Sequence, residues 1–284
     1  MPSTIDIRRR IRSVKNTQQI TKAMKMVSAA KLRRAQERMY AARPFSAALR
    51  EVLVSVAARV GEIDHPLLRK REEKRVLLLV VTADKGLCGA FNTNVIRNVG
   101  IAIRERGWTD VQLIPIGRKG NDALKRRALP IRHQAINIFQ ALSPNTAREL
   151  SQILIDDYVT EKVDAVYVIY NEFKSLLAQN VRVERLLPVE SIAASEEQTI
   201  EYLYEPAPAE ILDELLPKHV EFQLYRMLLE SAAAEHAARR NAMESATKNA
   251  ADMIDHLTLT YNRIRQAAIT KEIIEIVSGA SAQG

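Results

Sequence analysis

The chain has 284 residues, of which 47% are apolar and 27% charged, and its formal net charge is +8. This composition indicates a folded protein with a substantial core. The one cysteine, Cys88, excludes an internal disulfide framework and favours a reducing compartment. The longest apolar run, Val76–Val81, is far too short to cross a bilayer.

The positive charge is concentrated in the first fifty residues. They contain thirteen Lys or Arg residues against two carboxylates, Asp6 and Glu37, a local net charge of +11. Such a basic segment is expected to meet nucleic acid, an anionic membrane or an acidic protein surface.

The first element, about residues 3–59, is predicted to be one long helix because its only strong helix breaker is Pro44. Ser3 or Thr4 is a plausible N-cap. Apolar residues recur at steps of three and four within three groups, as in a coiled-coil seam. The groups are Ile7, Ile11 and Val14; Ile20, Met24 and Val27; and Leu32, Ala35 and Met39. Because the register jumps between groups, we expect the helix to change its facing partner along its length.

The middle, about residues 61–205, alternates predicted strands and helices. The run Arg75–Thr82 is typical of a strand buried on both faces. A helix at about 90–106, a strand at 111–116, helices at 117–127 and 145–160, and strands at 164–170 and 181–189 follow. This β-α-β-α order predicts a mostly parallel sheet with helices on both faces.

The last element, about residues 209–278, is a second long helix, with Pro217 as its only strong breaker. A seam is expected at Ile254, Leu257, Tyr261, Ile264 and Ala268. An alanine-rich stretch before it reflects either close backbone approach or simply high helix propensity. The apolar terminus, 269–280, is expected to be buried either in a partner or against the chain's own first helix.

Evidence for catalysis is weak. The turn Asp84–Gly89 lies where doubly wound folds bind nucleotides, but it lacks the three-glycine pattern, and the chain has no phosphate-loop motif. We interpret this turn and Gly117–Gly120 as structural. The five histidines show no metal-ligand spacing, and Cys88 has no nearby base, so no metal, cofactor or catalytic residue is expected.

Several motifs together resemble one family. The stretch Arg12–Lys31 (RSVKNTQQITKAMKMVSAAK) resembles the N-terminal signature of the gamma subunit of F-type ATP synthases. The tail with Thr270, Glu272, Glu275, Gly279 and Ala280 resembles its C-terminal signature. Asp84–Gly89 resembles the family's central loop, and Tyr202–Pro206 resembles the segment before its last helix. The matches lie in order along the whole chain.

The resemblance implies a rotor shaft with an α+β fold. The terminal helices, 1–60 and 206–284, would form a long antiparallel coiled coil, and 61–205 would form a central Rossmann-like α/β domain. The coiled coil would turn inside a ring of three alpha and three beta subunits, with the catalytic sites on the beta subunits. The central domain would bind the epsilon subunit and the c-ring. The assembly would lie peripherally on the cytoplasmic face of a bacterial cell membrane and drive proton-linked ATP synthesis.

The resemblance also implies contact residues. Those expected to touch the alpha and beta ring are Lys22, Met24, Lys25, Arg239, Arg265, Gln266, Thr270 and Glu272. Those expected near the c-ring and epsilon are Tyr202, Tyr204 and Glu205. Neither nucleic acid nor nucleotide is expected to bind directly. Some chloroplast-type members carry a regulatory cysteine pair, and with Cys88 alone this regulation should be absent.

Two other functions stay open on residue patterns alone. One is a basic coiled-coil nucleic-acid binder, favoured by the charge of residues 1–50. The other is an enzyme whose doubly wound domain would use Gly86 and Gly89. Binding assays with DNA and with nucleotide would distinguish both from an interaction rod.

Overall fold

The computed structural model describes residues 3–60, 65–127, 129–190 and 208–281. The chain divides into two compact units. Unit 1 combines Met1–Ser28 with Arg240–Gly284, and unit 2 is Ala29–Arg239. Two long helices, α1 (Thr4–Val60) and α5 (Pro208–Ser281), contribute to both units. The predicted division at residues 60 and 206 follows sequence elements rather than compactness and stays a prediction.

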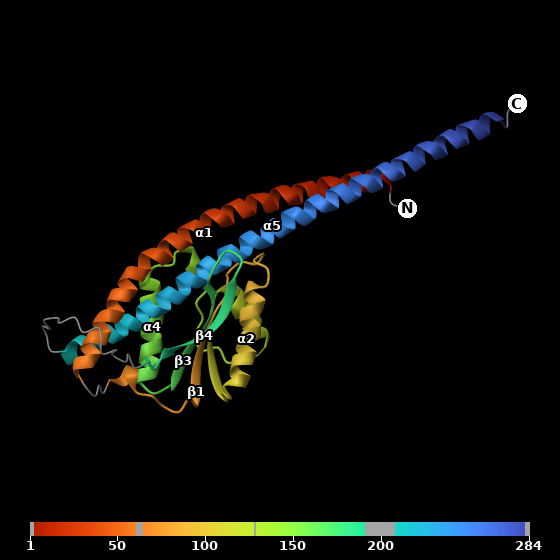
Figure 1. Cartoon of the computed structure of the whole chain (residues 1–284). Coiled ribbons are helices and arrows are strands. Elements are labelled where there is room, and N and C mark those ends of the chain that lie inside the picture. Colours follow the sequence, from red (N-terminus) through yellow and green to blue (C-terminus); the bar gives the residue numbers. More distant parts are fainter. Residues whose placement is uncertain (1–2, 61–64, 128, 191–207, 282–284) are drawn as a thin grey trace. The chain divides into compact units, whose positions relative to one another are not determined.

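In unit 1, α1 and α5 lie side by side and antiparallel (Figure 1). Arg8 donates to the Tyr261 hydroxyl at 2.6 Å. Farther along α1, the hydroxyls of Thr21 and Thr247 are 2.8 Å apart, and Lys25 pairs with Glu244 at 2.9 Å. Residues farther along α1 thus contact residues nearer the start of α5, which is the pairing of the predicted antiparallel coiled coil.

The seam of α1 differs from the predicted one. In unit 1 the buried and half-buried positions of α1 follow a continuous heptad that includes Thr21 and Ser28, with Met24 half-buried beside it. Ile20 and Val27, which were expected in the seam, are 60% and 56% exposed, whereas Ser28 is 3% exposed. The predicted register jump is therefore wrong. Ile20 and Val27 thus lie outside the seam, and polar side chains such as Thr21 and Ser28 occupy the seam positions in this part of α1.

On α5 the predicted seam is confirmed in part. Ile254, Leu257, Tyr261 and Ile264 are half-buried, but Ala268 is exposed. All residues from 265 to 278 are exposed, because α5 extends past the first residues of α1 (Figure 1). The terminal stretch therefore does not fold back on the chain's own first helix.

Unit 2 contains a four-stranded sheet of β1 (Arg75–Val81), β2 (Asp110–Ile116), β3 (Ala165–Phe173) and β4 (Gln179–Leu187). The strand order is β2-β1-β3-β4. β1 pairs in parallel with β2 and β3, and β3 pairs antiparallel with β4. The sheet is thus mixed, since residues 174–178 are too few for the crossover that a parallel β4 would need.

Helices cover both faces of this sheet, as predicted. On β1, alternate residues face opposite layers: Val76, Leu78 and Val80 pack toward α2 (Phe91–Glu105) and α3 (Arg118–Arg126). Leu77, Leu79 and Val81 belong to the larger core, which includes α4 (Pro144–Val159) and parts of α1 and α5. Short 3-10 helices lie at Pro66–Leu68 and Ile138–Gln140.

The alanine-rich stretch of α5 lies between two neighbours within unit 2. Ala233 and Ala237 pack against Leu32 of α1. Ala234 packs on the other side against the turn after β1, with Cys88 and Phe91. These three alanines are fully buried. Small side chains therefore serve close approach here, in addition to helix propensity.

Candidate partner-binding surfaces

The carboxyl edge of the parallel strands, where doubly wound folds bind phosphates, is occupied by the chain itself. The first backbone amides of α3 point at protein acceptors: Arg118 N donates to Asp84 Oδ1 at 3.0 Å, and Gly120 N donates to Thr82 Oγ1 at 2.8 Å. Lys119 N donates to the Ala83 carbonyl at 3.1 Å. The helix terminus that could hold a phosphate thus binds the turn after β1 instead.

Glycines at this edge serve packing. A Cβ at Gly117 would lie 2.1 Å from the Thr82 carbonyl oxygen, and one at Gly120 would lie 2.6 Å from Thr82 Oγ1. Gly117 also has φ of +91°, which disfavours other residues. The interpretation of Gly117–Gly120 as a structural turn fits this geometry. Within the described part of the chain, no group of three potential metal ligands occurs.

The turn Asp84–Gly89 is held by α5. Arg239 donates to the carbonyls of Lys85 and Gly86 at 3.2–3.3 Å and pairs with Glu235 at 2.7 Å. Burial raises the pKa of the Cys88 thiol, and burial likewise raises the pKa of Glu235 despite the opposing charge of Arg239. His236 is half-buried near Arg239 and Lys31, and desolvation and these cations lower its pKa to about 4.

Arg239 therefore differs from the other predicted contact residues. It is 9% exposed, and its guanidinium is engaged by acceptors of its own chain. Beside it lies a hollow of about 470 Å³ at the junction of α1, α5 and the turn after β1, with Lys31, Arg34, Arg38 and Lys85 in its lining. The structure gives Arg239 an internal role. Its predicted partner contact is not tested.

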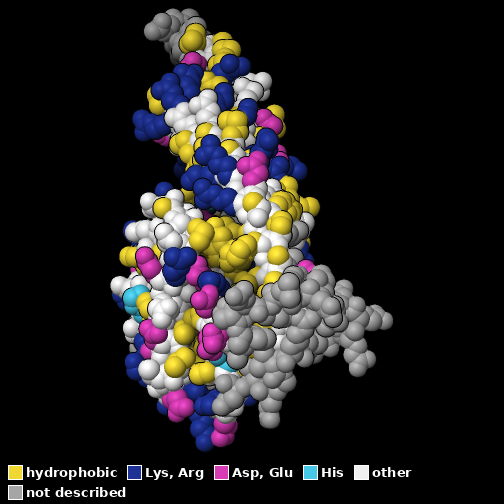
Figure 2. Space-filling view, turned by 90° about the vertical axis from the view of Figure 1, so that its left-hand side faces the viewer, with side chains coloured by type: hydrophobic (Ala, Val, Ile, Leu, Met, Phe, Trp, Pro, Cys, Tyr) yellow, Lys and Arg dark blue, Asp and Glu magenta, His cyan; other side chains and the backbone are white. Residues whose placement is uncertain are grey.

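The predicted contacts in unit 1 lie on the paired helices. Lys22 is exposed, and Met24 is half-buried beside the seam. Lys25 is engaged with Glu244, which lowers the pKa of that exposed carboxyl through the hydrogen bond and charge of Lys25. Figure 2 shows Lys and Arg side chains gathered over the upper part of the visible face, where the long helices lie.

The terminal stretch of α5 carries the other four predicted contacts, Arg265, Gln266, Thr270 and Glu272, all of them exposed. Large aliphatic side chains lie among them with unusual exposure; Ile276, for example, is 71% exposed. The others are Ile269, Ile273, Ile274 and Val277. An exposed apolar surface of this density is typical of a protein interface.

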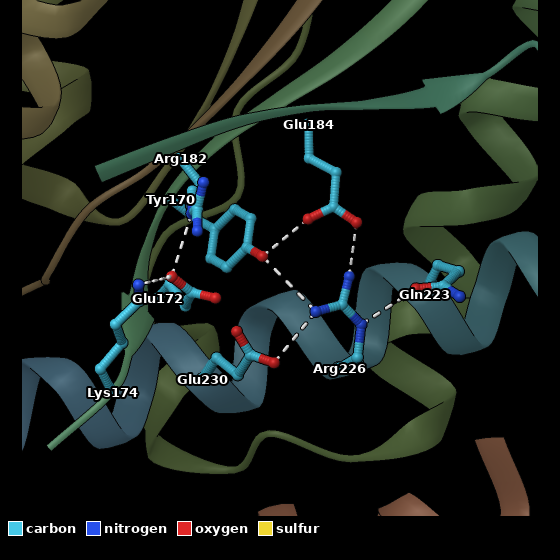
Figure 3. Close-up of polar contacts among 8 residues, drawn as sticks. All are labelled: Tyr170, Glu172, Lys174, Arg182, Glu184, Gln223, Arg226 and Glu230. Atoms are coloured by element: carbon cyan, nitrogen blue, oxygen red, sulfur yellow. Dashed lines mark hydrogen bonds and ion pairs between the residues drawn. The ribbon is translucent and has the colours of Figure 1, made fainter. Parts of the chain in front are cut away.

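A polar network that sequence reasoning missed joins α5 to the sheet (Figure 3). Arg226 donates to Glu184 at 2.6 Å and to Glu230 at 3.0 Å, and the Tyr170 hydroxyl donates to Glu184 at 2.8 Å. Burial raises the pKa of Tyr170, and it also raises the pKa of Glu230, although the charge of Arg226 opposes that second rise. The only sequence signal was the i,i+4 spacing of Arg226 and Glu230.

The predicted contacts with the c-ring and epsilon, Tyr202, Tyr204 and Glu205, lie outside the described residues. The structure therefore does not place them.

Comparisons with known proteins agree with the fold. A family model described as ATP synthase matches residues 3–283. The ATP synthase gamma chains of Pelotomaculum thermopropionicum and Solibacter usitatus are 50% and 52% identical to this chain, with 99% of each chain covered.

Solved structures are similar as well. A chain of the Tetrahymena thermophila mitochondrial ATP synthase central stalk and c-ring is 28% identical, with a TM-score of 0.62 over 80% of this chain and 99% of that one. A Euglena gracilis mitochondrial ATP synthase chain shares the fold, with a TM-score of 0.68, 20% identity and coverage of 99% and 94%. On this evidence the chain belongs to the family of ATP synthase gamma chains.

Proposed function

We propose that this chain is the central rotor shaft of a proton-translocating ATP synthase and carries no catalytic site of its own. The shaft couples rotation of a c-ring to conformational cycling of three catalytic beta subunits, which alternate with three alpha subunits. The observation that carries this proposal is the terminal stretch of α5, residues 265–278, exposed throughout although it bears five large aliphatic residues. Family membership supports the same role.

The two helices of unit 1 supply the asymmetry that such a shaft needs. α1 carries most of the cations, whereas the end of α5 is apolar with single charges. A partner shifts a conformational equilibrium only by its different affinity for the two states. A difference of about 1.4 kcal/mol in shaft contact between two beta conformers would change nucleotide affinity about tenfold.

The contacts that a rotating shaft makes with the surrounding ring must also break as the shaft turns. Exposed ion pairs contribute only about 0–1 kcal/mol each, so single contacts from exposed cations such as Lys22 can form and break without locking the shaft. Arg265, Gln266, Thr270 and Glu272 would act likewise from α5. Arg239, because it is buried, would support the shaft from within.

The proposed location of the subunit follows from its proposed partners. In the described part of the chain no helix has the length and apolarity needed to span a bilayer. We place the subunit peripherally at the cytoplasmic face of a bacterial cell membrane, attached through the c-ring and epsilon, with Tyr202, Tyr204 and Glu205 toward them.

Met24 provides the test. Met24→Lys or Met24→Glu would add a charge that binds or repels ring groups more strongly, while the seam beside it stays intact. We expect assembly to be preserved and proton pumping per ATP hydrolysed to fall, as measured in membrane vesicles. Met24→Leu, which adds no charge, is the matched control. Unchanged pumping per ATP in both charged variants would contradict the proposal.

A nucleic-acid role is favoured only by the exposed cations of α1. Filter binding of DNA to the full chain should be weak and should decline steeply with salt, since it would rest on charge alone. Tight binding that survives physiological salt would favour that second function.

A further inference from the structure

A separate depression lies in unit 2 between α2 and the start of β4. Its volume is about 560 Å³, and none of the residues discussed as ring, c-ring or epsilon contacts lines it. The lining residues are Asn94, Arg97, Asn98, Lys174, Gln179, Asn180, Val181 and Arg182. Three cations and four carboxamides thus surround one aliphatic side chain.

The charge of this depression is positive. No carboxylate is among its lining residues. Glu172, which is not among the lining residues, contacts Arg182 at 3.0 Å and Lys174 at 4.0 Å and offsets part of their charge (Figure 3). The side chain of Arg97 makes no hydrogen bond or ion pair with another described residue. Its guanidinium is therefore available to a carboxylate, which it can bind through two parallel hydrogen bonds.

The carboxamides suit a different group, the peptide bond. Gln179 Nε2 donates to the carbonyls of Ser175 and Leu176, and Asn98 Nδ2 donates to the Asn94 carbonyl. Their side-chain oxygens remain as acceptors, while Asn180 keeps both a donor and an acceptor. A carboxamide pairs with a backbone N–H and C=O, so this set fits main chain rather than an apolar ligand.

The strand beneath the depression adds a further match. Four consecutive residues of β4, 179–182, line it, and β4 ends the strand order of the sheet. Opposite Val181 in the register, Asn171 is 2% exposed and its Nδ2 has no acceptor among the described residues. The lining is thus mostly polar, a buried unpaired amide lies on the neighbouring strand, and the depression runs along an edge strand, where extended peptides bind.

We propose that this depression binds an extended, carboxylate-bearing segment of a partner protein. Arg97, Lys174 and Arg182 would bind its carboxylates, and the carboxamides of Asn94 and Asn180 would bind its backbone. A single small anion fits less well, because the side chains of Lys174 and Arg182 are about half exposed and each such contact contributes little. Several weak contacts on one segment would together give measurable affinity.

The test uses the full-length chain and a fluorescently labelled hexaglutamate peptide, with binding followed by anisotropy at low salt. Because the cations of α1 attract any polyanion, variants must locate the site. Arg97→Glu should weaken binding about tenfold, since it replaces an attraction by a repulsion. Arg97→Gln should weaken it about threefold. Arg104→Glu makes the same charge change on the exposed surface of α2 outside the depression and should stay within twofold.

A photo-crosslinker on the peptide should label residues 94–98 and 174–182. Equal losses in Arg97→Glu and Arg104→Glu, or crosslinks confined to α1, would overturn the proposal. A hexaglutamine peptide that binds as tightly would remove the need for carboxylates and overturn it too. Displacement of the peptide from this site by inorganic phosphate at millimolar concentration would show that the depression binds a small oxyanion, and it would overturn the proposed peptide segment.

Discussion

Arg239, which is paired with Glu235 on the same helix, is expected to hold the turn after β1 against α5 through its hydrogen bonds to the turn carbonyls. Arg239→Met would keep the length and apolar stem of the side chain but remove its guanidinium. It would break the 2.7 Å contact to Glu235 and the hydrogen bonds to the carbonyls of Lys85 and Gly86. Because both side chains are only about one-tenth exposed, Glu235 would be left as a buried, uncompensated carboxylate.

Loss of one partner of such a buried pair costs about 3–5 kcal/mol of the free energy of unfolding. The measurement is urea unfolding of the full chain at pH 7, followed by the fluorescence of Trp108, the only tryptophan, which is buried in unit 2. Arg240→Met, at the neighbouring position, should change stability by less than about 0.5 kcal/mol. The double variant Glu235→Met with Arg239→Met should lose less than Arg239→Met alone.

The loss of stability in Arg239→Met should depend on pH in a definite direction. Burial raises the pKa of Glu235 in the folded state, and Arg239 opposes that rise. Without Arg239 the folded protein takes up the proton more readily than the unfolded chain. The stability deficit of Arg239→Met should therefore be largest at pH 7 and shrink as the pH falls toward 4.5, the ordinary pKa of the carboxyl. A deficit below about 1 kcal/mol at pH 7, or one that grows on acidification, would refute this reasoning.

Three further outcomes are expected. The pKa of His236 is lowered to about 4, so folding favours its neutral form, and the stability that this gives above pH 6.5 is lost as the pH falls. In urea titrations, the free energy of unfolding of His236→Gln should therefore fall by about 1–2 kcal/mol less between pH 7 and pH 5 than that of the unsubstituted chain. Gly120→Ala should cost about 1–3 kcal/mol in the same titration, and combining it with Thr82→Ala should cost less than the two changes summed, because the clash is with the Thr82 side chain. Thr21→Val together with Thr247→Val removes both partners of a seam hydrogen bond, so thermal melting at 222 nm should show equal or higher helix stability; a clear loss would show that the bond stabilises the pair.

Local pattern in the sequence determined the elements. The run 76–81 predicts a strand buried on both faces, and β1 packs alternate residues into both cores. Ser143 before Pro144 marks the start of a helix, and the Ser143 side chain accepts from Thr146 N. The absence of glycine over two long spans predicts α1 and α5. Each of these signals is a property of one continuous segment, so it can be recognised from the sequence alone.

Tertiary structure decided which residues face which neighbours. The seam of α1 keeps its three–four rhythm through Thr21 and Ser28 because a partner helix fixes which side is covered, even where that side is polar. Arg239 donates to the carbonyls of Lys85 and Gly86, and Arg226 joins Tyr170 and Glu184, through contacts between residues far apart in sequence. Burial and charge compensation arise only when these segments pack together, and no local periodicity of the sequence predicts that packing.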